Sequence, residues 1–111
     1  MDIIFHGHHA DASDHMRQRA AAGVRRIARR LDRAVDASIR FEQDGPVRRV
    51  EIVLHAPRQR PLVATAEGRF YGPAIADALL RLQGQIAGAR RTARARVSAA
   101  RQARHRPLPT A

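Results

Sequence analysis

Residues 35–55 carry the clearest structural pattern of the sequence. From Val35 to Asp44 apolar and polar side chains alternate, and a second alternating run follows the turn-forming sequence Asp44-Gly45-Pro46. Alternation puts every second side chain on the same face of a strand. Each run therefore predicts a half-buried strand, and the pair predicts an antiparallel hairpin. The apolar positions are Ala37, Ile39, Phe41, Val50, Ile52 and Leu54.

Two shorter apolar runs predict two further strands. Residues 2–6 (DIIFH) form the first run, which Gly7 ends. A break from Pro57 to Pro61 separates the hairpin from the second run, residues 62–68 (LVATAEG). The sheet is therefore expected to contain four strands.

An amphipathic helix is predicted between the first strand and the hairpin. Ser13 is a typical N-cap, and Asp14 places an acid in the first turn, where it interacts favourably with the helix N-terminus. Apolar residues then recur at helical spacing, with arginines on the remaining faces. These apolar residues are Met16, Ala20, Val24, Ile27 and Leu31.

A second helix is predicted from about Pro73 to about residue 101, because proline suits the first turn and one narrow apolar stripe follows it. The stripe consists of Ile75, Leu79, Leu82, Ile86, Ala93 and Val97. A helix of this span is roughly 45 Å long, whereas a six-residue strand is roughly 20 Å long, so its far end must overhang the sheet. We expect residues 98–111 to form a basic helical extension and a flexible tail.

The order of these elements predicts an α+β fold with the sequence β-α-β-β-β-α. The first two strands are expected to be parallel, because a helix connects them, and the last two to add as an antiparallel meander. Both helices must cover the same face of the sheet, since each has a single apolar stripe to bury. The expected architecture is a two-layer sandwich, in which a four-stranded mixed sheet carries two helices on one face.

The charge of the chain favours a polyanionic partner. All 21 basic residues are arginine, only 10 residues are acidic, and the net charge is +11. Planar guanidinium groups bind phosphate well, so nucleic acid is favoured over an anionic membrane surface or a role in solubility alone. Two helices lying side by side would present a basic ridge. Its residues are Arg25, Arg26, Arg29, Arg30, Arg33, Arg81, Arg90, Arg91 and Arg94.

Length and composition exclude several classes of protein. A chain of 111 residues forms one domain, and the absence of cysteine excludes disulfides and thiolate metal sites. No apolar run approaches the roughly 20 residues that span a bilayer, and the N-terminus lacks the features of a signal peptide. We therefore expect a cytoplasmic protein.

A cluster of histidines and acids near the N-terminus is the only candidate for metal binding or catalysis. It consists of His6, His8, His9, Asp11, Asp14 and His15. Zinc sites need three or four converging ligands, helix capping accounts for the acids, and no nucleophile lies nearby. We therefore expect no enzymatic activity, no catalytic residue, no metal and no cofactor.

Phe70 and Tyr71 precede the second helix and have two interpretations. Aromatic side chains beside a basic surface can stack on nucleic-acid bases. The alternative, which we favour, is that the rings pack beneath the second helix.

Several short motifs, in order along the chain, resemble the ribosome hibernation promoting factor family, which includes the ribosome-associated inhibitor of translation. The resemblance covers about residues 1–96, with a one-residue extension between Pro57 and Pro61. The motifs are Gly7 with the polar pair that follows it, SDHMR (13–17), LDRA (31–34), EIVLHA (51–56), and ATAEG (64–68) with Ala74 and Ile75.

This resemblance implies the β-α-β-β-β-α fold, which is similar to that of double-stranded-RNA-binding domains. It also implies a protein that binds the small ribosomal subunit, occupies the channel for mRNA and tRNA, and so inhibits translation on idle ribosomes. Ribosomal RNA would be contacted by basic residues of the helices. By position, these are Arg26, Arg33, Arg81, Arg90 and Arg94.

Long members of the family add a C-terminal domain that pairs ribosomes. The residues after Arg104 are too few to form one, so we expect a short-form, monomeric member with its ribosome-binding domain in residues 1–97. Gly84 and Gly88 stand where the family is often basic, which leaves the pattern of RNA contacts open. Two alternatives to ribosome binding also stay open: a general binder of structured RNA, and a small metal-dependent RNA-processing enzyme.

Overall fold

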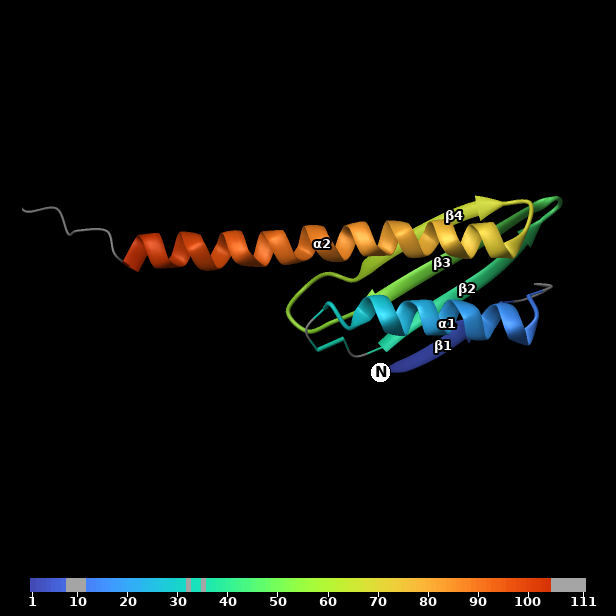
Figure 1. Cartoon of the computed structure of the whole chain (residues 1–111), viewed down its shortest axis with the longest axis horizontal. Coiled ribbons are helices and arrows are strands. Elements are labelled where there is room, and N and C mark those ends of the chain that lie inside the picture. Colours follow the sequence, from blue (N-terminus) through green and yellow to red (C-terminus); the bar gives the residue numbers. More distant parts are fainter. Residues whose placement is uncertain (8–11, 32, 35, 105–111) are drawn as a thin grey trace, which may run out of the picture.

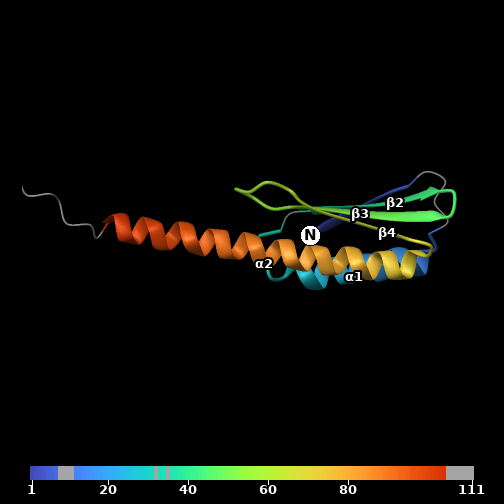
Figure 2. The same cartoon turned by 90° about the horizontal axis from the view of Figure 1, so that it is seen from above.

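The computed structural model describes residues 1–7, 12–31, 33–34 and 36–104. Both helices lie on one side of the sheet, so the predicted two-layer arrangement is confirmed (Figure 1 and Figure 2). The elements follow the predicted order. They are β1 (Asp2–His6), α1 (Asp14–Ala28), β2 (Asp36–Asp44), β3 (Val47–His55), β4 (Leu62–Gly68) and α2 (Tyr71–Arg104).

The strands lie in the order β1-β2-β3-β4. β1 is parallel to β2, and the other two pairs are antiparallel, as the connections predicted. Gly45 has φ +58°, a left-handed conformation that suits the tight turn between β2 and β3. The register places Ile39 opposite Ile52, and Ile52 opposite Ala64, so that apolar residues of neighbouring strands share one face.

The core lies between this apolar face and the two helices. Gly23 allows α1 to approach α2 closely, since a Cβ atom at this position would lie only 2.5 Å from Cδ1 of Leu79. The largest fully buried side chains come from α1, β2, β3 and α2. They are Val24, Ile39, Phe41, Val50, Ile52, Leu54, Ile75, Leu82 and Ile86.

α1 is shorter than its apolar stripe predicted. Ser13 caps the helix as expected, since its hydroxyl oxygen accepts a hydrogen bond from the Met16 N–H. The last turn then tightens, because the N–H of Leu31 donates to the carbonyl of Ala28, three residues back. Leu31 therefore reaches the core from the turn after α1 rather than from the helix itself.

α2 begins two residues before Pro73, with Tyr71, and continues without a break to Arg104. Its 34 residues correspond to about 51 Å, so it extends far past the sheet (Figure 1). Ile86 is the last residue of the stripe that is fully buried, and every residue from Arg90 to Gln102 is exposed. The expected overhang is confirmed, while residues 105–111, where the tail was predicted, lie outside the described residues.

Polar side chains of α2 cover the outer edge of β4. The side-chain amide of Gln85 accepts a hydrogen bond from the N–H of Val63 and donates another to its carbonyl. Arg81 donates to the carbonyl of Thr65. These contacts satisfy backbone groups that an edge strand would otherwise offer to another strand.

None of the helices in the described ranges has the length and apolar character needed to span a membrane.

Candidate nucleic-acid interface

The open face of the sheet carries the acids of the strands. Because side chains alternate along a strand, each of these acids lies on the side that the helices leave uncovered. The acids are Asp2, Asp36, Glu42, Asp44, Glu51 and Glu67. The two helices contain only Asp14 and Asp77, and each forms an ion pair with an arginine of its own helix. Acidic charge is thus concentrated on one face of the molecule.

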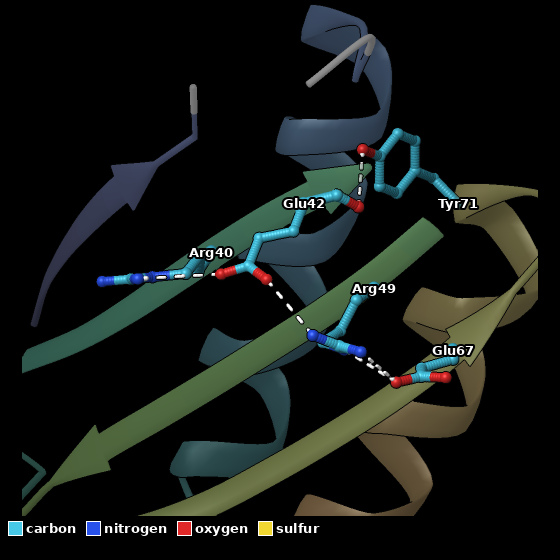
Figure 3. A network of polar contacts seen from close by, with 5 residues as sticks. All are labelled: Arg40, Glu42, Arg49, Glu67 and Tyr71. Carbon is cyan, nitrogen blue, oxygen red and sulfur yellow. Dashed lines mark hydrogen bonds and ion pairs between the residues drawn. The ribbon is translucent and has the colours of Figure 1, made fainter. Parts of the chain in front are cut away.

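Arg49 lies at the centre of an ion-pair network on this open face (Figure 3). Its Nη2 lies 2.6 Å from Oε1 of Glu67, and its Nη1 lies 3.4 Å from Oε2 of Glu42. Arg40 reaches the other oxygen of Glu42 at 3.7 Å. The hydrogen bond and the charge of Glu67, with a smaller contribution from Glu42, raise the pKa of Arg49. The arginines of the open face are therefore largely neutralised by its acids.

The arginines predicted for the first helix are exposed on the other side of the molecule. Arg25 and Arg26 lie in the last turn of α1. The placement of Arg29, Arg30 and Arg33 on that helix was wrong, because the tightened turn ends α1 at Ala28 and leaves them in the following segment. Within the described part of the chain, none of these five side chains has a hydrogen bond or an ion pair.

The arginines predicted for α2 fall into two groups. Arg81 packs against the sheet edge, where its Nη2 lies 3.3 Å from Oδ2 of Asp77 and its Nη1 binds the Thr65 carbonyl. Arg90, Arg91 and Arg94 are exposed on the overhanging half of the helix and have no such partner among residues 36–104. The last three therefore offer free guanidinium groups, whereas Arg81 is already engaged.

Three arginines from the predicted set meet in one open pocket of about 530 Å³. Arg30 and Arg33 come from the segment after α1, and Arg90 comes from α2. A fourth arginine, Arg58 of the β3–β4 loop, also lines this pocket, and Arg60 lines an adjoining hollow with Arg58 and Arg96. Neither Arg58 nor Arg60 was among the residues predicted from the sequence. The sequence feature that could have indicated them is the basic loop PRQRP at residues 57–61, whose prolines predicted only a break between strands.

A groove runs between the two helices on their outer face. Arg19 and Arg26 of α1 line it, together with Leu79 and Leu80 of α2, around a hollow of about 620 Å³. Arg19 was not among the predicted RNA-binding residues, although it lies about two helical turns before Arg26 on the same face of α1. The helical layer thus combines exposed guanidinium groups with an uneven surface.

The histidine cluster is only partly placed. His6 is exposed at the end of β1, and His15 is exposed in the first turn of α1. His8, His9 and Asp11 lie outside the described residues. In the remainder of the chain, no three histidine, aspartate or glutamate residues come together in a way that could hold a metal ion.

Tyr71 packs in the core, as the second interpretation of the aromatic pair predicted. Its ring meets Phe41 edge to face, with 5.4 Å between ring centroids, and its hydroxyl donates to the backbone carbonyl of Glu42 at 3.2 Å (Figure 3). Phe70 differs, since it is 69% exposed in the loop before α2. Tyr71 is therefore unable to stack on a base, whereas the exposed ring of Phe70 is accessible for stacking.

Two solved structures have the same fold as this chain. A ribosomal subunit interface protein from Coxiella burnetii superimposes with a TM-score of 0.74 at 20% identity, covering 81% of this chain and 98% of its own. The N-terminal domain of Protein Y from Thermus thermophilus gives a TM-score of 0.64 at 24% identity, covering 77% of this chain and 91% of its own. At these identities the likeness establishes the fold.

The family is established by the sequence itself. A search of curated proteins gives no significant match. The sequence profile of one family, however, matches residues 3–94, which is most of the chain and contains the whole sheet except Asp2. This match confirms the resemblance found from the short motifs. The chain belongs to the sigma 54 modulation protein / S30EA ribosomal protein family.

Proposed function

We propose that this chain binds the small ribosomal subunit through the arginines of its helical side, and that it inhibits translation by occupying the channel for mRNA and tRNA. The family, and the structural similarity to a ribosomal subunit interface protein, support a ribosomal partner. The observation that carries the proposal is the separation of charge. Arginines on the open sheet face are paired with acids, whereas those at the end of α1 and on the overhang of α2 are not.

Unpaired guanidinium groups suit the phosphates of ribosomal RNA. Each arginine that meets a phosphate releases condensed counterions, so the binding free energy depends steeply on salt. The arrangement of α2 extends the reach of this surface, because Arg90, Arg91 and Arg94 lie beyond the sheet on an exposed helix. In this proposal residues 1–97 form the ribosome-binding domain, and the rest of α2 is a basic extension.

The inhibition would be steric and would need no catalytic residue. A folded domain held between the head and body of the subunit excludes mRNA and tRNA by volume alone. In this proposal the protein acts in the cytoplasm, where its ribosomal partner is. We further expect the chain to act as a monomer, since nothing in this mechanism calls for a second copy.

Co-sedimentation with purified small subunits in sucrose gradients tests the proposal at several salt concentrations. The variant Arg91→Gln/Arg94→Gln removes two exposed guanidinium groups that do not line the pocket around Arg58. We expect weaker binding, and a plot of log K against log salt concentration that is shallower by about 2, because two phosphate contacts are lost.

The matched control is Arg40→Gln/Arg69→Gln, which has the same net charge. Arg40 lies on the open sheet face, and Arg69 lies in the loop between β4 and α2. This control should bind as the wild type does. Equal weakening of the two variants would contradict a role for the helical side. Wild-type binding to free double-stranded RNA but not to small subunits would favour the general RNA binder instead.

A competition experiment tests the occupied channel separately. Small subunits that already carry mRNA and tRNA should no longer bind the protein. Undiminished binding to these loaded subunits would refute channel occupancy while leaving ribosome binding intact.

A further inference from the structure

Four arginines that are distant in sequence line one pocket. Arg30 and Arg33 follow α1, Arg58 belongs to the β3–β4 loop and Arg90 to α2, so tertiary structure alone brings them together. The described residues that line this pocket include no acid, and none of the four arginines has an ion pair or hydrogen bond there. Asp32, beside Arg33 in the sequence, lies outside the described residues. We call this site the arginine pocket.

Backbone conformation sets two of these arginines apart. Arg33 has φ 58° and Arg58 has φ 64°, and in the described ranges they are the only residues other than glycine with positive φ. The left-handed conformation is unfavourable for residues that have a Cβ atom, whereas glycine adopts it without this cost. Both positions nevertheless carry arginine, and both line the same pocket. Such a concentration of backbone strain is typical of a functional site.

The shape of the arginine pocket suits a compact ligand. The short side chains of Ala89 and Ala93 line it from α2 and leave room between the guanidinium groups. Its volume of about 530 Å³ is in the usual range for small-ligand sites, about 300–1,000 Å³. A hollow lined by charges of one sign, with apolar walls, concentrates the electrostatic potential inside it.

We propose that the arginine pocket binds two adjacent phosphate groups. Guanidinium groups donate paired hydrogen bonds to phosphate oxygens, and four of them provide enough donors to bind two adjacent phosphates. Two sources offer this chemistry: a tight turn of an RNA backbone, and a free nucleoside diphosphate or triphosphate. Only the RNA source rests on the proposed function, because a free phosphate compound needs no ribosome.

Isothermal titration calorimetry with inorganic tripolyphosphate, at constant ionic strength, tests this site on the full chain. The informative variant is Arg33→Gly/Arg58→Gly, since glycine accepts positive φ and the loops can keep their course. We expect its affinity for tripolyphosphate to fall about tenfold or more, with an unchanged or higher Tm. The control Arg40→Gln/Arg69→Gln, with the same net charge, should stay within about twofold of wild type.

Thermal unfolding gives a second measurement. Tripolyphosphate should raise the Tm of the wild type and of the control, because it binds the folded chain, and should raise that of the glycine variant much less. Absence of tripolyphosphate binding in the wild type would overturn the proposal. Equal losses of affinity in the glycine variant and the control would overturn it too, since net charge alone would then explain binding.

Two further titrations separate the sources of phosphate. If the glycine variant loses more small-subunit binding than the control does, the RNA backbone supplies the phosphates. If its ribosome binding matches the control while its binding of ATP is lost, the ligand is a free nucleotide. Either result supports the arginine pocket, and tripolyphosphate binding can succeed even if the chain does not bind ribosomes.

Discussion

Gly84→Ala should stabilise the fold, although it changes a residue inside the longest helix. A Cβ atom built at Gly84 meets no other atom within 4 Å, so alanine fits without displacing a neighbour. Glycine costs a helix interior about 1 kcal/mol relative to alanine, because it loses more backbone entropy on folding. Leu82 and Ile86, on either side, are buried in the core, so this part of α2 unfolds with the whole domain.

The free energy of unfolding should therefore rise by about 1 kcal/mol, which corresponds to about 4–8 °C in Tm for a domain of this size. Urea denaturation followed by circular dichroism measures the change directly, with an m-value equal to that of the wild type. The matched variant is Gly45→Ala, which also meets nothing within 4 Å. Its φ of +58° should make alanine destabilising by about 1 kcal/mol.

These two substitutions separate backbone conformation from available space. The same methyl group enters open space at both positions, so opposite signs can come only from the backbone. A lower urea midpoint for Gly84→Ala, or equal shifts for the two variants, would refute the reasoning.

Two further predictions concern side-chain packing and a hydrogen bond of Tyr71. Leu82→Ala should lower the free energy of unfolding by about 2–5 kcal/mol, because Leu82 is fully buried. Val97 lies on the overhang and is 52% exposed, so Val97→Ala should change the free energy of unfolding by less than about 0.5 kcal/mol. Similar urea midpoints for the two variants would contradict the conclusion that α2 has a packed first half and an exposed overhang. Tyr71→Phe keeps the ring contact with Phe41 but loses the hydrogen bond to the Glu42 carbonyl, so thermal unfolding should show a loss of about 1 kcal/mol. An unchanged Tm would show that this bond contributes nothing.

The strands could be predicted from the sequence because burial on one face imposes a period of two residues. Residues 62–68 were predicted with the bounds of β4, and the alternating residues of the hairpin lie in β2 and β3. The end of α1 could not be predicted in the same way. Leu31 continues the helical spacing but is buried by a tightened turn, and a hydrophobic period does not distinguish the two conformations.

For the candidate site, the sequence predicted the type of residue better than it predicted how these residues are arranged in space. The arginine-rich segments identified eight guanidinium groups that have no partner among the described residues, but Arg81 was included although Asp77, four residues earlier, is well placed to pair with it. Arg58 was missed because it lies in a loop, and loop positions follow no period that would reveal their neighbours. Only the tertiary structure shows that Arg58 lines the same pocket as Arg33 and Arg90.

The uneven placement of charge also affects how the molecule approaches a partner. Acids on the open sheet face and unpaired arginines near the helices give the protein a permanent electric dipole across its two layers. In the field of a polyanion this dipole exerts a torque that turns the helices forward before any contact forms. Orientation during diffusion raises the association rate, and salt weakens it by screening. In the proposed function, the paired acids of the sheet thus contribute to recognition by facing away from the ribosomal RNA.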